Sequence, residues 1–508
     1  MSLRVARLSP TPSDARPVAF FKASSGIDDF SWNSAFHLLT SWGLRLSGIP
    51  VTYFACDHGM SRCVLGTDRD HPEKEPPCKS CVYQSKTLYT GASVEWFHFE
   101  RDAELAKQLA GLSLKDLMSF EYKDIPLAAL VLPGLRWILR RYNLIENEST
   151  LFFFREYILS AWNVARQFDK FLDAVNPRSL VVFNGQFFPE ATAKWIATKR
   201  GIRVISHEVG LLPMTGFFTD GESTAYPITI PETFELDESQ NSRLDAYLQN
   251  RFQGNFSMAG VKFWPNMKGL DQALLNKMGN FKQVVPVFTN VIFDTSQPHA
   301  NTIFSDMFVW LDLILATAQK HPETLFIIRA HPDETRVRKS SLETVAEWVD
   351  ECGATSLDNI LFIPPQENIS SYELIARSKF VAIYNSTIGL EASIMGSAVL
   401  CAGKARFTQY PIVFFPESRE NYSRMLEEFL SADTITPPAN FRRNARRFLY
   451  YQLFRTSLPF GDFLKTGIRS THAILKWFDP RDLLKSPAIL TVKKGIINQE
   501  DFLLEEKL

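Results

Sequence analysis

The sequence predicts an α/β protein made of two Rossmann-like domains that face one another across a cleft, followed by a C-terminal helical extension. Short apolar runs of strand length alternate with amphipathic helical runs in both halves of the chain. Two of these runs, within 326–334 and 380–396, stop abruptly at small and polar residues. Because open parallel sheets bind ligands at the carboxyl ends of their strands, these segments mark the expected site.

Three regions are expected along the 508 residues. Residues 1–265 form the first Rossmann-like domain, which includes a cysteine-rich insertion over 56–81. Residues 266–430 form the second Rossmann-like domain, and residues 431–508 form the helical extension.

Strands and helices are expected to alternate through most of the chain. In the first half the pattern predicts strand 17–24, helix 31–47, strand 49–55, a mostly helical stretch 100–175, strand 179–184, helix 189–200 and strand 202–206. In the second half it predicts strand 284–289, helix 304–320, strand 325–330, helix 341–351, strand 360–363, helix 370–377, strand 379–384, helix 388–395 and strand 398–401. The segment 215–280 is rich in Gly, Pro, Asn and Thr, which predicts loops and the crossing between domains.

The composition gives no general support for nucleic-acid binding, since 55 basic and 56 acidic residues leave a net charge of −1. The first apolar run, Val18 to Phe21, is too short for an N-terminal signal peptide, and no run of about 18 apolar residues is present to span a membrane. We therefore expect a cytoplasmic protein without a nucleic-acid partner, and contact with the inner membrane surface stays open.

Five residues after the two strands carry chemistry that suits a nucleotide. His331 can donate a ring N–H to a phosphate oxygen, and Pro332 restricts the backbone after it. Ser386 and Thr387 supply hydroxyls where a helix begins, and Glu391 lies one turn further on, where a carboxylate can accept ribose hydroxyls. Singly, a structural His, a helix N-cap and an ordinary helix carboxylate are the alternatives.

Asn290 follows another expected strand and is a further candidate for a phosphate or acceptor contact. A role in a turn explains it equally well.

Three runs resemble those of bacterial capsule polysaccharide biosynthesis glycosyltransferases of GT-B fold. They are Ile-Arg-Ala-His-Pro-Asp-Glu, Ser-Ser-Tyr-Glu-Leu-Ile and Tyr-Asn-Ser-Thr-Ile-Gly-Leu-Glu-Ala, and the resemblance is strongest over 284–415. Such enzymes are similar in turn to capsular Kdo transferases and bacterial sialyltransferases. The resemblance implies that the second domain binds a nucleotide sugar, often CMP-linked, through His331, Pro332, Ser386 and Thr387, with Glu391 on the ribose.

The resemblance also implies an acceptor domain in the first half, which must supply a base for the attacking hydroxyl. Glu208 is the leading candidate and His207 the second, in a His-Glu-Val-Gly run expected at a strand end. A structural turn is the alternative for this run. Asp28 and Asp29 are the other candidates for the base.

Four cysteines, Cys56, Cys63, Cys78 and Cys81, cluster within the insertion. Cys78 and Cys81 have the spacing of a metal knuckle, whereas the first pair is more widely spaced. A structural Zn²⁺ and four free thiols are both open, and an iron–sulfur cluster is a further alternative.

The C-terminal stretch Arg442 to Phe454 interleaves arginines with aromatic residues. A tail helix that crosses back onto the first domain is favoured over a foot on anionic lipid.

The expected function is sugar transfer from a nucleotide-sugar donor to a capsular or other surface glycan, free or lipid-linked. The alternatives are another GT-B reaction, such as nucleotide-sugar epimerisation or polyol-phosphate transfer, and a non-catalytic role in glycan assembly.

Overall fold

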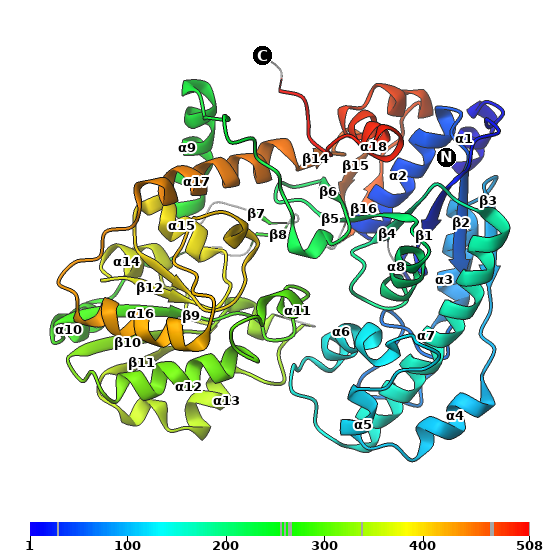
Figure 1. Cartoon of the computed structure of the whole chain (residues 1–508). Coiled ribbons are helices and arrows are strands. Elements are labelled where there is room, and N and C mark those ends of the chain that lie inside the picture. The colour runs from blue at the N-terminus through cyan, green and yellow to red at the C-terminus, as the bar shows by residue number, and fades with distance from the viewer. Residues whose placement is uncertain are drawn as a thin grey trace.

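The computed structural model describes residues 1–27, 30–253, 257–258, 261–262, 267–336, 339–467 and 472–506. The chain forms two lobes, each built around its own sheet (Figure 1). The C-terminal segment returns to the first lobe, where its last helix lies beside the N-terminal helices (Figure 1).

The first sheet has seven strands. They are β1 Val18–Phe21, β2 Val51–Cys56, β3 Ser93–Phe97, β4 Ser179–Phe183, β5 Arg203–Val209, β6 Thr215–Asp220 and β14 Leu458–Pro459. The order is β14-β6-β5-β4-β1-β2-β3, and β1 to β5 pair in parallel. Read from β3, this is the 3-2-1-4-5 order of a Rossmann half, whose strand order reverses between β1 and β4.

The second sheet repeats that order with five strands. They are β9 Gln283–Phe288, β10 Thr324–Arg329, β11 Ile360–Ile363, β12 Val381–Ile383 and β13 Val399–Cys401. All pairs are parallel in the order β11-β10-β9-β12-β13, so the reversal lies between β9 and β12. The predicted GT-B-like α/β class with two Rossmann-like domains is thus confirmed.

Alternation along the strands builds a core on each face of the first sheet. Phe21 and Phe54 pack on one face under α7 (Glu148–Val175) and α8 (Glu190–Lys199). Phe20 and Tyr53, one residue earlier in each strand, pack on the other face with α2 (Trp32–Leu46) and α18 (Pro487–Asn498). Because helices cover both faces of the sheet, successive residues of these strands are buried, which explains why the strand sequences are continuously apolar.

The remaining elements are distributed between the lobes. The first lobe also holds α1 Ser2–Leu8, α3 Cys78–Leu88, α4 Ala103–Ala110, α5 Leu114–Met118, α6 Leu127–Leu139, β15 Leu464–Thr466 and β16 Ala473–Leu475. The second lobe holds α10 Gln272–Gly279, α12 Met307–Ala318, α13 Val345–Glu351, α14 Ser371–Ala376, α15 Ile388–Met395, α16 Arg419–Ser431 and α17 Ala439–Tyr450. Between or beside them lie α9 Glu238–Phe252, α11 Gln297–Ala300, β7 Ser257–Met258 and β8 Val261–Lys262.

Two expectations about the middle of the chain were wrong. The segment 215–280 is not only loops, because it contains β6, α9 and α10. The run His207 to Gly210 does not follow a strand end, because β5 continues to Val209 and pairs antiparallel with β6 from Ile205 onward. Cross-strand pairing extended a strand that local turn residues had seemed to stop.

The C-terminal region contains strands as well as helices. β14 joins the edge of the first sheet beside β6, and α18 packs on α2. Leu244 and Leu248 of α9 share a core cluster with Phe448 of α17, so α9 packs with the second lobe although it precedes residue 266. The limits 1–265, 266–430 and 431–508 stay predictions.

The arginines of α17 have partners within the chain. Arg446 binds Asp245 of α9 at 2.7 Å, and Arg443 forms an ion pair with Glu235. Buried Arg447 donates to the carbonyl of Pro231 at 2.6 Å. These contacts, with the packing of α17 on α15, hold the helix on the second lobe, so it does not cross back onto the first domain as expected. Contact with anionic lipid stays a prediction.

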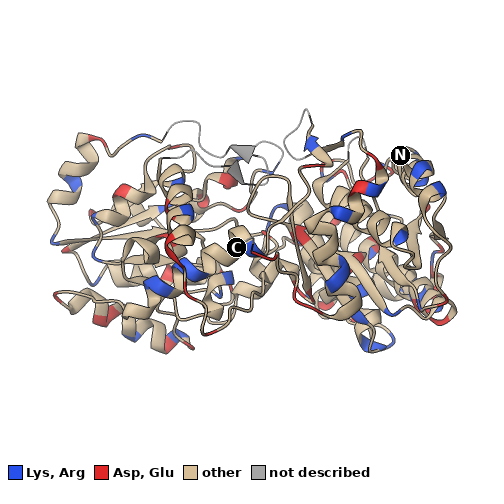
Figure 2. Cartoon of the chain, turned by 90° about the horizontal axis from the view of Figure 1, so that it is seen from above, with Lys and Arg blue, Asp and Glu red and all other residues tan. Residues whose placement is uncertain are grey.

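Basic and acidic residues are interspersed over both lobes in Figure 2. Within the described part of the chain, no helix combines the length and apolar character needed to cross a bilayer.

Replacing Phe54 by Ala is expected to lower the free energy of unfolding of the first lobe by about 3–5 kcal/mol. The Phe54 ring is 1% exposed and lies 4.7 Å from that of Phe97 and 5.7 Å from that of Phe21, so its loss opens a cavity. Denaturant titration measures the change. Tyr83→Ala, at a side chain that is 75% exposed, is the control, expected to change stability by less than about 0.5 kcal/mol. Equal stability of the two variants contradicts the prediction.

Candidate functional site

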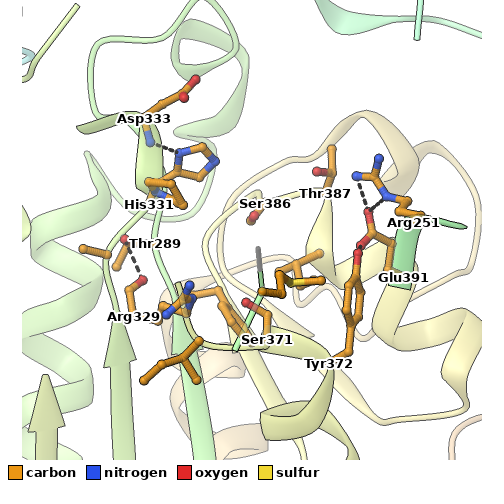
Figure 3. Close-up of a pocket in the computed structure, with 16 residues that line it drawn as sticks. Arg251, Thr289, Arg329, His331, Asp333, Ser371, Tyr372, Ser386, Thr387 and Glu391 are labelled. Atoms are coloured by element: carbon orange, nitrogen blue, oxygen red, sulfur yellow. Dashed lines mark hydrogen bonds and ion pairs between the residues drawn. The ribbon is translucent and has the colours of Figure 1, made fainter. Parts of the chain in front are cut away.

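A cavity of about 140 Å³ lies at the carboxyl edge of the second sheet, where the strand order reverses. We call it the Tyr372 cavity, and Figure 3 shows the side chains that line it. They include Arg251, Thr289, Arg329, His331, Asp333, Ser371, Tyr372, Ser386, Thr387 and Glu391. The sequence predicts one site for His331, Pro332, Ser386, Thr387 and Glu391, and all five line this cavity.

A second cavity of about 250 Å³ adjoins the first and opens toward the other lobe. We call it the Lys404 cavity. Its lining includes Trp137, Asn290, Asp294, His299, Arg336, Lys339, Lys404 and Arg406. His331, Asp333, Ser386 and Thr387 line both cavities, so these residues form the boundary between them.

His331 is held in one tautomer by its own loop. The backbone N–H of Asp333 donates to His331 Nδ1 at 3.1 Å (Figure 3), so the neutral ring carries its proton on Nε2. Burial lowers the pKa of His331, while the nearby carboxylates of Asp333 and Asp294 act in the opposite direction. The result is a neutral imidazole with one N–H available to a ligand oxygen.

Ser386 and Thr387 sit where β12 gives way to α15. Thr387 is the N-cap of α15, yet its hydroxyl makes no capping bond to this helix, all of whose residues are described. The Thr387 hydroxyl is therefore not used as a cap, and Ser386 beside it lines both cavities in front of the helix N-terminus, which carries a partial positive charge.

Glu391 is buried within an ion pair that the sequence did not reveal. Arg251 Nε of α9 donates to one carboxylate oxygen at 2.6 Å, and the Tyr372 hydroxyl donates to the other at 2.5 Å (Figure 3). Burial and the neighbouring Glu391 carboxylate raise the pKa of Tyr372. Arg251, Tyr372 and Glu391 together line the wall of this cavity, and the contact of Glu391 with a ribose stays a prediction.

Asn290 lies in the Lys404 cavity, as a ligand contact requires. Its Oδ1 is buried and has no hydrogen-bond partner among the described residues. The same cavity gathers cations from two separate segments, namely Arg336 and Lys339 from one and Lys404 and Arg406 from the other. Such a lining suits an anionic group beside His331.

The predicted bases Glu208 and His207 lie away from these cavities. His207 is fully buried with its Nε2 3.0 Å from His37 Nδ1, and burial lowers the pKa of His207 to about 3. The Glu208 carboxylate accepts from Asn33 Nδ2 at 3.0 Å, and burial raises its pKa. Neither residue lines the Tyr372 or the Lys404 cavity. Asp28 and Asp29 lie outside the described residues.

A third cavity, about 360 Å³, opens at the corresponding place on the first sheet, between the carboxyl ends of β1 and β4. We call it the Lys22 cavity. Lys22 follows β1, and its Nζ lies 4.2 Å from the centre of the Phe183 ring at the end of β4. Glu190, at the start of α8, shares the lining, and burial raises the pKa of its carboxyl. Neither Lys22 nor Glu190 is expected at a site from the sequence.

Trp137 joins the two lobes at the site, because it lines both the Lys22 cavity and the Lys404 cavity. Ligands in the two cavities would thus meet at this ring.

The four clustered cysteines are free thiols that line one cavity of about 30 Å³. We call it the cysteine cavity. Within the described residues, no three His, Cys, Asp or Glu side chains are arranged to hold a metal ion. A single Zn²⁺ held by Cys56, Cys63, Cys78 and Cys81 is therefore not supported by this geometry.

Comparison with known proteins agrees with the resemblance over part of the chain. Residues 270–412 match the family described as Capsule polysaccharide biosynthesis protein. This segment contains β9 to β13 and the predicted nucleotide-binding residues of the second lobe. The expected likeness to capsule polysaccharide biosynthesis proteins is confirmed there.

A curated relative, Protein FixF of Sinorhizobium fredii, is 27% identical over 220 residues, which are 42% of this chain. The match spans about half of the relative, 49% of its length. Among solved structures, a KpsC beta Kdo 2,4 transferase from Thermosulfurimonas dismutans is 9% identical with a TM-score of 0.34, covering 61% of this chain and 87% of that one. A putative UDP-N-acetylglucosamine 2-epimerase from Listeria monocytogenes is 10% identical with a TM-score of 0.26, covering 97% and 100%.

The burial of His207 predicts a pH-dependent stability. Unfolded His207 takes up a proton below about 6.5, whereas the folded ring does so only near pH 3. The free energy of unfolding is therefore not reduced by this histidine above pH 6.5. It decreases as the pH falls from 6.5 toward 3, because only the unfolded chain binds the proton in that range. His207→Gln should show a shallower fall in denaturant titrations, and His98→Gln, at an exposed histidine, should keep the full slope. Equal slopes for the two variants contradict the prediction.

Proposed function

We propose that this chain is a glycosyltransferase that moves a sugar from a nucleotide-sugar donor to a capsular or other surface glycan. The observation that supports it most is the position of His331, Ser386 and Thr387 between two cavities. A nucleoside in the Tyr372 cavity and a sugar in the Lys404 cavity would place the linking phosphate at these three side chains.

In this proposal the second lobe stabilises the leaving group. As the sugar–phosphate bond breaks, negative charge grows on the phosphate, and fixed donors lower the energy of that state. His331 Nε2–H, the hydroxyls of Ser386 and Thr387 and the N-terminus of α15 are the donors. Arg251, Tyr372 and Glu391 hold the ribose side, and Asn290 faces the sugar side.

The first lobe supplies the acceptor site and the base. The Lys22 cavity has aromatic walls that suit a sugar ring, and it meets the donor side at Trp137. We infer that Glu190 is the base, because its carboxylate lines this cavity, whereas the predicted Glu208 and His207 do not line it. Lys22 lies near enough to lower the pKa of Glu190, which burial raises.

The proposal also specifies the nucleotide of the donor and the kind of acceptor. A CMP-linked donor follows from the resemblance to capsular Kdo transferases and sialyltransferases, and the acceptor is a glycan that is free or lipid-linked. Titration calorimetry with CMP, UDP and GDP, followed by mass spectrometry of donor hydrolysis, tests the nucleotide. A scaffold without catalytic function binds none of the three, and an epimerase converts its nucleotide sugar without consuming an acceptor.

His331→Ala is expected to lower turnover about 10²–10³-fold, because one preorganised donor to the leaving phosphate is lost. His98→Ala, at an exposed histidine in the other lobe, is the matched control and should keep full activity. Circular dichroism checks that both variants are folded. Full activity of His331→Ala would overturn the assignment of this side chain to the phosphate.

The identity of the base is tested by a pair of conservative variants. Glu190→Gln should lower turnover about 10²–10⁴-fold while nucleotide affinity, measured by calorimetry, stays unchanged. Glu208→Gln should have a small effect on turnover, because Glu208 does not line the Lys22 cavity and its carboxylate is held by Asn33. The reverse result would assign the base to Glu208, as the sequence alone had predicted.

A further inference from the structure

The loop that follows α6 joins the first lobe to the second through one carboxylate. α6 lies on the side of its lobe that faces the other lobe (Figure 1). The backbone N–H groups of Tyr142 and Asn143 donate to Glu343 Oε2 at 2.8 and 3.0 Å. The Asn143 side-chain amide donates to Glu343 Oε1 at 2.7 Å. We call the loop 140–143, together with Glu343, the interlobe latch.

Neutral hydrogen bonds flank this carboxylate. The Leu342 N–H donates to the Arg140 carbonyl at 3.0 Å. The Tyr142 hydroxyl accepts from Asn301 Nδ2 at 2.8 Å. Hydrogen bonds to an ionised acceptor are roughly twice as strong as those between neutral groups. The carboxylate of Glu343 is therefore the main anchor of the latch.

The latch fixes the position of Trp137, which lies in the last turn of α6. The Arg140 guanidinium carbon lies 4.1 Å from the centre of the Trp137 ring and 5.2 Å from that of Phe293, a residue of the second lobe. Arg140 is buried, so its cation is held in contact with both rings. Because Trp137 lines the Lys22 cavity and the Lys404 cavity, the latch holds the ring that these cavities share.

On the second lobe, the latch is tied to the loop that carries His331. The Ser341 N–H donates to the Glu334 carbonyl at 2.7 Å, and the Val345 N–H donates to Glu334 Oε1 at 3.4 Å. Glu334 belongs to the short helical turn whose N-cap is His331. Glu343 lies between the two bonded residues in the chain. The segment that anchors the first lobe is thus fastened to the loop that presents His331 to both cavities.

We propose that Glu343 is a positioning residue for sugar transfer. By binding Tyr142 and Asn143 it holds Trp137 where an acceptor in the Lys22 cavity meets a donor in the Lys404 cavity. Glu343 lines neither of these cavities nor the Tyr372 cavity, so it acts through the loop and not by touching a substrate. The role in transfer rests on the proposed function, whereas the latch itself does not.

Hydrogen exchange on the full chain tests the latch without any substrate. Glu343→Ala removes all three bonds to the carboxylate, so the Tyr142 and Asn143 amides, followed on peptides that cover 137–144, should exchange about tenfold faster or more. Glu343→Gln should stay close to the native chain, because glutamine and Asn143 can still bond through their amide groups. Glu351→Ala, at an exposed glutamate of α13, is the control with native exchange. Native exchange in Glu343→Ala would overturn the latch.

Transfer to an acceptor tests the positioning role. The probes are CMP-, UDP- and GDP-linked sugars as donors and methyl glycosides of hexoses as acceptors. Glu343→Ala should lower kcat/KM for the acceptor about tenfold, because Trp137 is no longer fixed, and Glu343→Gln should restore most of it. Donor hydrolysis by water and nucleotide affinity should each change less than about twofold, since neither needs an acceptor in the Lys22 cavity. Equal losses of transfer and hydrolysis would show a structural role only and overturn the proposal.

A second variant serves if Glu343→Ala does not fold. Asn143→Ala removes one of the three bonds at an exposed side chain, so it should lower transfer selectively by about two- to fivefold. Native transfer and native exchange in this variant would contradict the proposal. The two proposals fail differently. Native exchange in Glu343→Ala counts against the latch alone, whereas a native chain that transfers to no acceptor counts against the proposed function and the positioning role together.

Discussion

The parallel pairing of β9 with both β10 and β12 is the constraint on which the candidate site depends. From β9 the strand order runs through β10 to β11 on one side and through β12 to β13 on the other. A crevice therefore opens at the carboxyl edge between β9 and β12, where the order reverses. The loop that carries His331 follows β10, and the pair Ser386-Thr387 follows β12. This strand order brings both loops to the same cavity.

The first lobe has the same order of parallel strands, but it places different side chains where the order reverses. Its order reverses between β1 and β4, and there the chain places Lys22 and Glu190 around a cavity with aromatic walls. One lobe therefore offers hydrogen-bond donors and cations beside a helix N-terminus, and the other offers a buried carboxylate. Trp137, the residue common to both cavities across the cleft, gives the two halves a common boundary.

The part of the site that could be predicted consists of residues whose position follows from local sequence. His331, Ser386 and Thr387 come directly after strong apolar strands, so their place at the sheet edge could be read from the pattern. Arg251 could not be found in this way, because it reaches Glu391 from α9, 140 residues earlier in the chain. His207 and Glu208 were misplaced because pairing with β6 prolonged β5 beyond its local turn signals.

The sequence by itself determined the class of the fold, most of the strands and helices, the residues that follow β10 and β12 at the edge of the second sheet, and the clustering of the four cysteines, since each depends on neighbours within a few residues. Only the tertiary structure decided that the C-terminal strand joins the first sheet, that the Glu391 carboxylate is already paired, and that Glu190 rather than Glu208 faces a cavity. The physical reason is that burial and pairing depend on contacts between segments far apart in the chain, which no local pattern encodes.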